Sequence, residues 1–275
     1  MDELKDAWTR LDVHRQEWRL PPKAGEPRGA ALKDGAAKLA DVGVGSGATL
    51  HLKDLGPQVG YSTVFFWEYF GPIVAYVLVY NLPELVYGAA YEKTETQRWA
   101  YWYFVGHFQK RIMETFFVHR FSHATMPVFN LWKNTAYYTG FAAFVAYFLC
   151  HPLYTSPPPA RVRVGLGLAL VMQASNFVCH VILRNLRRPG EKGYKIPKGF
   201  LFNYVTCANY CTEIYGWFFF NVATQSVWGV LFMLAGAGQM LQWAVAKHKR
   251  LRKLFDGKDG REKYPRRWVI LPPFI

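Results

Sequence analysis

Long apolar runs alternate with short polar connectors along residues 61–275, whereas the first sixty residues are mostly polar. A helix needs about 20 predominantly apolar residues to cross the hydrocarbon core of a bilayer. Six runs of this kind lie near residues 61–83, 99–118, 135–153, 164–183, 200–221 and 224–245. The second and fifth runs carry charged side chains, which a membrane helix tolerates when they face the interior of a bundle. The pattern predicts an all-α polytopic membrane protein with about six transmembrane helices.

The polar first part of the chain has the periodicity of a small α+β fold. Leu4, Trp8 and Leu11 have the spacing of a short amphipathic helix. The segments EWRL at 17–20 and ATLHLKDL at 48–55 alternate apolar and polar residues, as half-buried strands do. This part of the chain is therefore expected to fold outside the membrane.

A glycine-rich stretch at 43–47 separates the two predicted strands. It precedes a strand rather than a helix and lacks the full dinucleotide-binding fingerprint, so we interpret it as a turn. The N-terminus is polar and charged, so the sequence predicts no cleavable signal peptide, and the first apolar run would direct insertion. We expect a cytosolic segment over residues 1–54 and a membrane-embedded domain over residues 55–275.

Charge is distributed unevenly along the chain. The formal net charge is +14, yet residues 1–60 hold nine Lys and Arg against nine Asp and Glu. The connectors 184–199 and 246–275 hold sixteen of the other 24 cationic residues, whereas the connectors 84–98 and 154–163 hold four. Cytosolic loops of membrane proteins are enriched in Lys and Arg, so both termini are expected in the cytosol. Because the charge lies beside apolar runs and not on a soluble face, we expect no nucleic-acid partner.

Cysteine and histidine spacing favours no metal centre. The four cysteines lie in or beside apolar runs without forming a CxxC pair, and Cys207 and Cys211 are interpreted as packing residues. His119 and His123 have the HxxxH spacing that places two imidazoles on one helix face. Membrane di-iron enzymes need several such boxes, and this chain has no second one. We therefore expect no metal.

Polar residues inside the apolar runs are the most informative feature of the chain. The segment 173–213 places six cationic side chains between two apolar runs. Asn176 and His180 lie inside the first of these runs, and Asn209 and Glu213 lie inside the second. Polar groups inside a bilayer are costly and usually face a bundle interior or a ligand. This arrangement is suited to binding a phosphate-bearing cofactor at the cytosolic end of the helices.

Several long motifs resemble one enzyme family. They are KRIMETFFVHRFSHATMP, KNTAYYTGFAAFVAYFLCHPLYT, NFVCHVILRNLRRPGEKGYKIPKGFLFNYVTCANYCTEIYGW and KYPRRWVILPPFI. From about residue 54 to the C-terminus, the chain resembles the trans-2-enoyl-CoA reductases of very-long-chain fatty-acid elongation, within the steroid 5-alpha-reductase family.

The resemblance implies an enzyme of the endoplasmic reticulum membrane that reduces the 2,3 double bond of an acyl-CoA with NADPH. Its implied partners are the acyl-CoA substrate and the other elongase subunits, namely the condensing enzyme, the ketoreductase and the dehydratase. The family also carries a ubiquitin-like N-terminal domain. Residues 1–54 resemble the helix and later strands of that domain without its first hairpin, which indicates a truncated ubiquitin-like segment.

The resemblance also implies the catalytic residues. Reduction of an enoyl thioester requires stabilisation of negative charge on the thioester oxygen and delivery of a proton to the α carbon. Tyr210 in the ANYCTE motif matches the essential tyrosine of the family. Lys110 in HFQKR is the best match to its essential lysine, although Arg111 could serve equally.

The cofactor residues follow from the same resemblance. NADPH carries a pyrophosphate and a 2′-phosphate, which favour cationic partners. The residues carried over are Asn176, Arg184, Arg187, Lys195, Asn209 and Glu213, with Lys247 and His248 from the basic segment AKHKRLRKLF. The chain departs from steroid-reducing relatives in having His180 in place of an acid and Lys195 in place of Arg.

Two other functions remain open from the sequence. A steroid or polyprenol double-bond reductase would share the fold and the cofactor. A non-catalytic membrane scaffold that presents a ubiquitin-like segment would have no need for Tyr210 or Glu213 inside the membrane.

Overall fold

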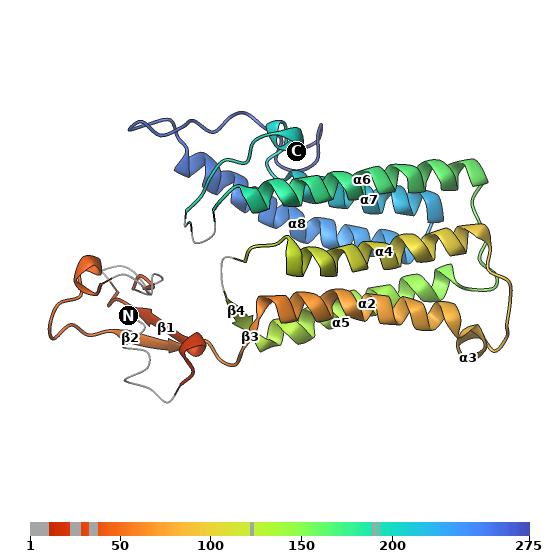
Figure 1. Cartoon of the computed structure of the whole chain (residues 1–275), viewed down its shortest axis with the longest axis horizontal. Coiled ribbons are helices and arrows are strands. Elements are labelled where there is room, and N and C mark those ends of the chain that lie inside the picture. The colour runs from red at the N-terminus through yellow and green to blue at the C-terminus, as the bar shows by residue number, and fades with distance from the viewer. Residues whose placement is uncertain (1–10, 23–28, 33–37, 122–123, 189–190, 192) are drawn as a thin grey trace. The chain divides into compact units, whose positions relative to one another are not determined.

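The computed structural model describes residues 11–22, 29–32, 38–121, 124–188, 191 and 193–275. The chain divides into two compact units (Figure 1). The first unit combines residues 1–64 with 121–134, and the second combines residues 65–120 with 135–275.

Two short antiparallel strand pairs belong to the first unit. Strand β1 (Gln16–Arg19) pairs with β2 (His51–Asp54), and β3 (Gln58–Gly60) pairs with β4 (Thr125–Pro127). Short 3-10 helices, η1 (Val13–Arg15) and η2 (Ala40–Val42), lie around the first pair.

The first strand pair coincides with the two strands predicted from alternation, and the glycine-rich stretch between them forms turns, with Gly43 and Gly47 at positive φ. The second pair was not predicted, because its partners are far apart in the chain. The predicted helix at Leu4 to Leu11 lies almost entirely outside the described residues, and the ubiquitin-like character of this segment stays a prediction.

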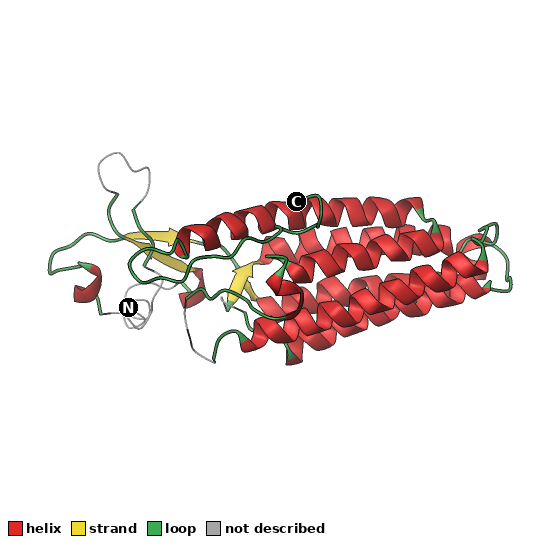
Figure 2. Ribbon diagram, turned by 90° about the horizontal axis from the view of Figure 1, so that it is seen from above, coloured by secondary structure: helices red, strands yellow, loops and turns green. Residues whose placement is uncertain are grey.

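Among the described residues, six helices have 17 residues or more. They are α2 (Tyr61–Asn81), α4 (Glu95–Phe117), α5 (Val128–Leu149), α6 (Pro159–Asn185), α7 (Ala208–Thr224) and α8 (Val227–Leu254). A one-turn helix, α3 (Pro83–Tyr87), follows α2, and the 3-10 helix η3 (Phe200–Asn203) precedes α7. Within the second unit the long helices run side by side (Figures 1 and 2).

Each predicted membrane run overlaps one of these helices. Helices α2, α6 and α8 are long and apolar enough to cross a bilayer. Helix α4 carries several charged residues, and α7 is only 17 residues long. The mostly helical fold is therefore confirmed, and the described residues contain three candidate membrane spans by length and composition.

The fifth predicted run, 200–221, begins eight residues before the helix that it predicts. Its first part forms η3 and a loop, and at the end of this loop the main chain bonds to the C-terminal tail instead of continuing into the helix. Thr206 N donates to Trp268 O at 2.8 Å and Cys207 N donates to Val269 O at 3.1 Å. Helix α7 begins only after these bonds, at Ala208.

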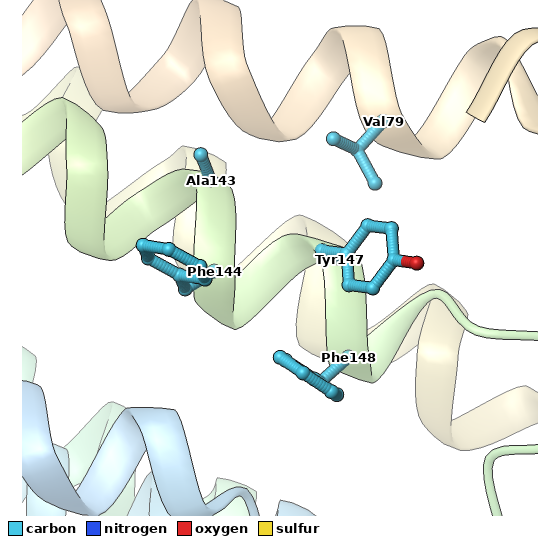
Figure 3. Close-up of a pocket in the computed structure, with 5 residues that line it drawn as sticks. All are labelled: Val79, Ala143, Phe144, Tyr147 and Phe148. Carbon is cyan, nitrogen blue, oxygen red and sulfur yellow. The ribbon is translucent and has the colours of Figure 1, made fainter.

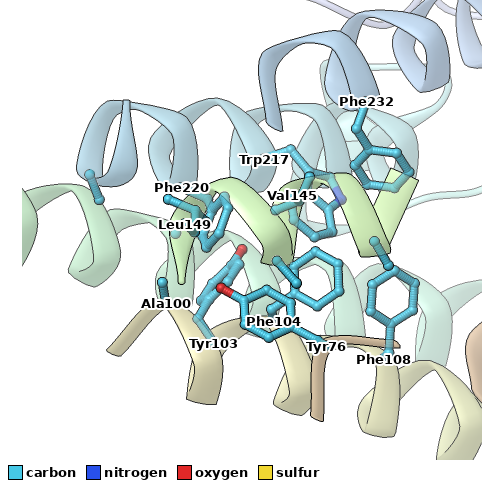
Figure 4. Packing of buried hydrophobic residues seen from close by; sticks show 14 of the residues in the cluster. Tyr76, Ala100, Tyr103, Phe104, Phe108, Val145, Leu149, Trp217, Phe220 and Phe232 are labelled. Carbon is cyan, nitrogen blue, oxygen red and sulfur yellow. The ribbon is translucent and has the colours of Figure 1, made fainter. Parts of the chain in front are cut away.

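Aromatic side chains from different helices build the core of the second unit (Figure 4). The ring centroids of Tyr76 on α2 and Phe104 on α4 are 4.7 Å apart, and those of Trp217 on α7 and Phe232 on α8 are 5.0 Å apart. Such tilted and edge-to-face pairs add to the stability gained from burying apolar area. This core fixes α4 beside α7, which matters for the polar residues that both helices carry.

Helices α6 and α7 approach each other closely at Gly165. A Cβ atom built there would lie 2.9 Å from the Cβ of Ala223 and 3.0 Å from the main-chain oxygen of Phe219. Only glycine permits that approach. It brings the polar residues of α6 within hydrogen-bonding distance of α7.

Candidate active site

Four polar residues lie on one face of α4. Lys110, Arg111 and Glu114 follow His107 by three, four and seven positions, a spacing that places all four side chains on the same side of a helix. His107 is 5% exposed and Glu114 is 1% exposed. Charged groups are costly in such surroundings unless they are paired, so their partners define the site.

Lys110 is held by three side chains from two helices. Its Nζ donates to Asn176 Oδ1 at 2.7 Å and to Gln173 Oε1 at 3.3 Å, both on α6. The same nitrogen lies 3.2 Å from Glu114 Oε1. An ammonium group has three donor hydrogens, so these contacts use its full capacity. The predicted catalytic cation is thus fixed between α4 and α6.

Arg111 forms the neighbouring ion pair. Its Nη1 bonds to Glu114 Oε2 and lies 3.2 Å from His180 Nδ1, while its Nη2 donates to Tyr69 OH at 3.0 Å. His180 Nδ1 is also 3.0 Å from Glu114 Oε1. The single carboxylate of Glu114 therefore compensates two cations, Lys110 and Arg111.

Glu213 supplies a second carboxylate from α7. Its Oε1 accepts a hydrogen bond from Trp217 Nε1 at 3.0 Å and lies 3.4 Å from His107 Nε2. The other ring nitrogen of His107 is 3.1 Å from Gln173 Oε1, which Lys110 also contacts. Glu213 is thus connected to Lys110 through His107 and Gln173.

Asn176 joins the α4 cluster to the first turn of α7. Its Oδ1 accepts from Lys110, and its Nδ2 donates to the main-chain oxygen of Asn209 at 2.8 Å and to Thr212 Oγ1 at 3.3 Å. The side-chain oxygen of Asn209 is buried and has no hydrogen-bond partner among the described residues. A buried acceptor without a partner is costly, so this oxygen marks a place where a bound molecule can donate a hydrogen bond.

Tyr210 lies on α7 but outside this network. Its ring packs among apolar residues of α8 and the C-terminal tail, with its centroid 6.3 Å from that of Trp243. Within the described part of the chain, its hydroxyl forms no hydrogen bond and no contact joins it to Lys110. The structure therefore brings Lys110, Asn176 and Asn209 together and leaves the Tyr210 hydroxyl unengaged.

The basic connector after α6 makes its contacts outside the network around Lys110. Arg120 donates to the main-chain oxygens of Arg184 at 3.2 Å and Arg187 at 2.7 Å, so a cation closes the C-terminus of α6, as the helix dipole favours. Lys195 pairs with Glu191 at 2.6 Å in an exposed ion pair. The Arg184 side chain is exposed and forms no hydrogen bond or ion pair with a described residue.

The two predicted residues on α8 differ in their surroundings. Lys247 is half-buried, and its side chain forms no hydrogen bond or ion pair with a residue that the structure describes. His248 Nδ1 is 2.7 Å from the hydroxyl of Thr206, which in turn accepts from Tyr264 OH at 2.9 Å. Thr206 and Tyr264 are both buried, so the hydroxyl that contacts His248 belongs to the interior of the protein.

A cluster of potential metal ligands lies beside Arg111. Glu114, His119 and His180 each offer one ligand atom within 4.8 Å of the others. Arg111 already bonds to Glu114 and lies against His180, so the geometry favours an ion-paired cluster over a metal centre. Burial and the neighbouring cations lower the pKa of His119, which follows α4, to about 3. The other histidine of the HxxxH pair, His123, lies outside the described residues.

Sequence reasoning missed four members of the network: His107, Glu114, Gln173 and Trp217. The signal was present in the spacing. His107 and Glu114 are seven positions apart on the face that also carries Lys110, inside a run otherwise read as a membrane helix. Gln173 precedes Asn176 by three positions on α6. A polar stripe at helical spacing inside an apolar run predicts a buried polar interface.

An apolar pocket of about 320 Å³ lies elsewhere, between α2 and α5 (Figure 3). It is lined by Val79, Ala143, Phe144, Tyr147 and Phe148. The lining carries no charged side chain, and the Tyr147 hydroxyl is the one polar side-chain group among these five residues. The polar network, not this pocket, is therefore the candidate for chemistry.

Comparison with known proteins agrees with the sequence motifs. The family profile described as 3-oxo-5-alpha-steroid 4-dehydrogenase matches residues 124–275. The chain is 45% identical over 268 residues to a Dictyostelium discoideum protein named very-long-chain enoyl-CoA reductase, covering 97% of this chain and 88% of that protein.

Two animal proteins are also similar. A Caenorhabditis elegans protein named "Probable very-long-chain enoyl-CoA reductase art-1" is 42% identical over 97% of this chain and 86% of its own length. A Mus musculus protein named trans-2,3-enoyl-CoA reductase-like is 33% identical over 93% of this chain and 76% of its own length. The chain therefore belongs to the 3-oxo-5-alpha-steroid 4-dehydrogenase family of membrane oxidoreductases and, within it, to the group of the very-long-chain enoyl-CoA reductases.

Proposed function

We propose that the protein reduces the 2,3 double bond of trans-2-enoyl-CoA to the saturated acyl-CoA with NADPH, the last step of each round of very-long-chain fatty-acid elongation. The observation that carries the proposal is the buried network around Lys110. It joins one cation to Asn176, Asn209 and Glu213 in a chain whose relatives are named for enoyl-CoA reduction.

The residues of the network fit a nicotinamide nucleotide. The unpaired Asn209 oxygen can accept from an amide or hydroxyl group, and Glu213 offers a further acceptor. The cationic Arg184, Arg187 and Lys195 would neutralise phosphate charge at the cytosolic side. Lys247 and His248 would contribute from α8. When bound, NADPH supplies the hydride.

The protein's own part in the chemistry is to supply a proton and to stabilise charge. We assign the proton, or the hydrogen bond that develops toward the substrate, to the Tyr210 hydroxyl, because no described residue competes for it. We assign the stabilisation of negative charge on the thioester oxygen to the positive potential of Lys110. Asn176 orients Lys110, since it accepts the shortest of the hydrogen bonds that Lys110 donates.

The cellular setting of the proposal is the endoplasmic reticulum membrane. The six long helices would all cross the bilayer, with both termini and the two basic connectors in the cytosol. Helices α4, α5 and α7, which are not among the candidate spans by length and composition, would cross as members of the bundle with their polar faces turned inward. The condensing enzyme, ketoreductase and dehydratase of the elongase would be its membrane partners.

A steroid or polyprenol double-bond reductase is the second candidate, because the matched family profile is named for steroid substrates. The profile covers residues 124–275, whereas the Dictyostelium relative covers 97% of this chain. The match to the enoyl-CoA reductase covers more of this chain than the match to the steroid profile, and it therefore favours an acyl-CoA substrate. A non-catalytic scaffold is disfavoured, because it has no use for a buried network that is costly to maintain.

The deciding experiment is an assay of microsomes that express the full chain. Incubation with trans-2-hexadecenoyl-CoA and NADPH should yield the saturated acyl-CoA, whereas a 4-ene-3-oxo steroid should remain unreduced. Microsomes without the chain measure the background of the host. Reduction of the steroid without reduction of the enoyl-CoA would favour the steroid or polyprenol reductase. If neither substrate is reduced, the result would support the non-catalytic scaffold.

A further inference from the structure

Three side chains far apart in the sequence form a hydrogen-bonded chain that ends on α8. Tyr264 of the C-terminal tail donates to Thr206 Oγ1 at 2.9 Å, and Thr206 Oγ1 lies 2.7 Å from His248 Nδ1. The rings of His248 and Tyr264 also meet edge to face, with centroids 5.6 Å apart. Thr206 is fully buried and Tyr264 is 8% exposed, so the bond between them is shielded from water, whereas His248 is half-buried.

The acidity of the three groups sets the direction of the chain. A phenol is a better donor than an aliphatic hydroxyl, and a neutral imidazole nitrogen is the strongest acceptor of the three. With Tyr264 donating to Thr206, the one hydrogen of the threonine hydroxyl is free to be donated to His248 Nδ1, the strongest acceptor within its reach. Bonds aligned in this way polarise and strengthen one another. A neutral imidazole that accepts at Nδ1 carries its hydrogen on Nε2.

The main chain keeps the three residues in place. Thr206 N donates to Trp268 O, and Trp268 N donates to Tyr204 O at 2.9 Å, so the tail is bonded to the loop before α7 on both sides of Thr206. His248 Nε2 bonds to no residue in the described part of the chain. It lies on the cationic last turns of α8, next to Lys247 and Lys249.

We propose that Tyr264 and Thr206 are positioning residues that hold His248 as the Nε2–H tautomer, so that Nε2–H donates to a phosphate oxygen of the dinucleotide. The tautomer is inferred from the hydrogen-bonded chain alone. The phosphate contact rests on the proposed function. The neighbouring cations attract a phosphate group from any direction. A fixed Nε2–H group adds a directional hydrogen bond, which places one phosphate oxygen.

The tautomer is tested on the full-length protein in detergent, without nucleotide, by nitrogen NMR after selective labelling of histidine with 15N. The signal that disappears in His248→Gln identifies His248. Wild-type protein should show protonated Nε2 and unprotonated Nδ1. Thr206→Val and Tyr264→Phe should lose this preference, whereas Thr206→Ser should retain it and Tyr204→Phe, on the exposed face of the same loop, should leave it unchanged. An Nδ1–H tautomer or an imidazolium in the wild type, or a signal unaffected by Thr206→Val, overturns the inference.

The phosphate contact is tested by titration of NADPH into the same proteins. Loss of one charge-assisted hydrogen bond should raise Kd about tenfold in His248→Gln and severalfold in Tyr264→Phe, with KM for NADPH rising and kcat little changed. An unchanged Kd in His248→Gln, with the tautomer as expected, overturns the phosphate contact. Absence of NADPH binding to wild-type protein overturns the proposed function instead, and the NMR result still decides the tautomer.

Discussion

Lys110 and Asn176 are joined by a 2.7 Å hydrogen bond from α4 to α6, although they are 66 positions apart in the chain. The amide nitrogen of the same asparagine reaches the main chain of Asn209 on α7. One side chain therefore connects three helices and sets the position of the cation relative to the start of α7. A substitution of Lys110 should consequently also alter the position of the candidate cofactor residue Asn209.

Replacement of Lys110 by methionine keeps most of the length of the side chain, which is one atom shorter, and removes its charge. We expect turnover of enoyl-CoA to fall about 10²-fold, the effect of removing one stabilising group from a developing oxyanion. Lys110→Arg keeps the charge and should retain part of the activity. Protein level and NADPH binding are measured alongside. Full activity in Lys110→Met would assign the catalytic cation elsewhere, with Arg111 the first candidate.

Replacement of the buried Glu114 by glutamine leaves two partly buried cations without their shared carboxylate. Breaking a buried ion pair in this way should cost about 3–5 kcal/mol of stability. The measurement is the apparent Tm of the purified protein in detergent, compared with Glu92→Gln, which removes an exposed carboxylate. Equal Tm values for the two variants would show that Glu114 is not the counterion of the cluster.

Replacement of Tyr210 by phenylalanine removes a hydroxyl and keeps the ring that packs near Trp243. If the hydroxyl supplies the proton, turnover should fall about 10²- to 10⁴-fold while NADPH binding and expression stay near wild type. Retained turnover would reduce Tyr210 to a packing residue. Joint loss of turnover and NADPH binding would place it in the cofactor site.

The protein should bind NADPH more tightly than NADH. Each charge-assisted contact to the 2′-phosphate is worth about 1.5–3 kcal/mol, or roughly 10- to 150-fold in affinity. Both nucleotides are titrated into the wild-type protein and into Arg187→Gln. The difference in affinity between NADPH and NADH should be smaller in the variant. Equal affinity in the wild type would remove the basic connector from the cofactor site.

Both chain termini should lie in the cytosol if all six long helices cross the membrane. A glycosylation sequon appended after Ile275 is expected to remain unmodified in microsomes, whereas one inserted in the connector between α5 and α6 should be modified. Modification of the C-terminal sequon contradicts an even number of spans.

The sequence by itself determined where the helices lie and which family the chain belongs to. Apolar length reports directly on the solvent that a segment enters, so each of the six runs overlaps a helix. Polar residues in those runs, such as Asn176 and Glu213, identified the buried interface, because polar side chains are costly in an apolar environment unless they have partners there. The long motifs carried the resemblance that the comparisons then confirmed.

Only the tertiary structure decided which polar residues meet. The hydrogen bond from Asn176 to Asn209 depends on the close approach of α6 to α7 at Gly165, and the hydrogen bond from Lys110 to Asn176 depends on the aromatic core that places α4 beside them; no local pattern encodes those distances. The late start of α7 has the same cause, because the loop before it bonds to a tail more than sixty residues further along the chain. Spacing along one helix predicts which side chains share a face, whereas packing between helices chooses their partners.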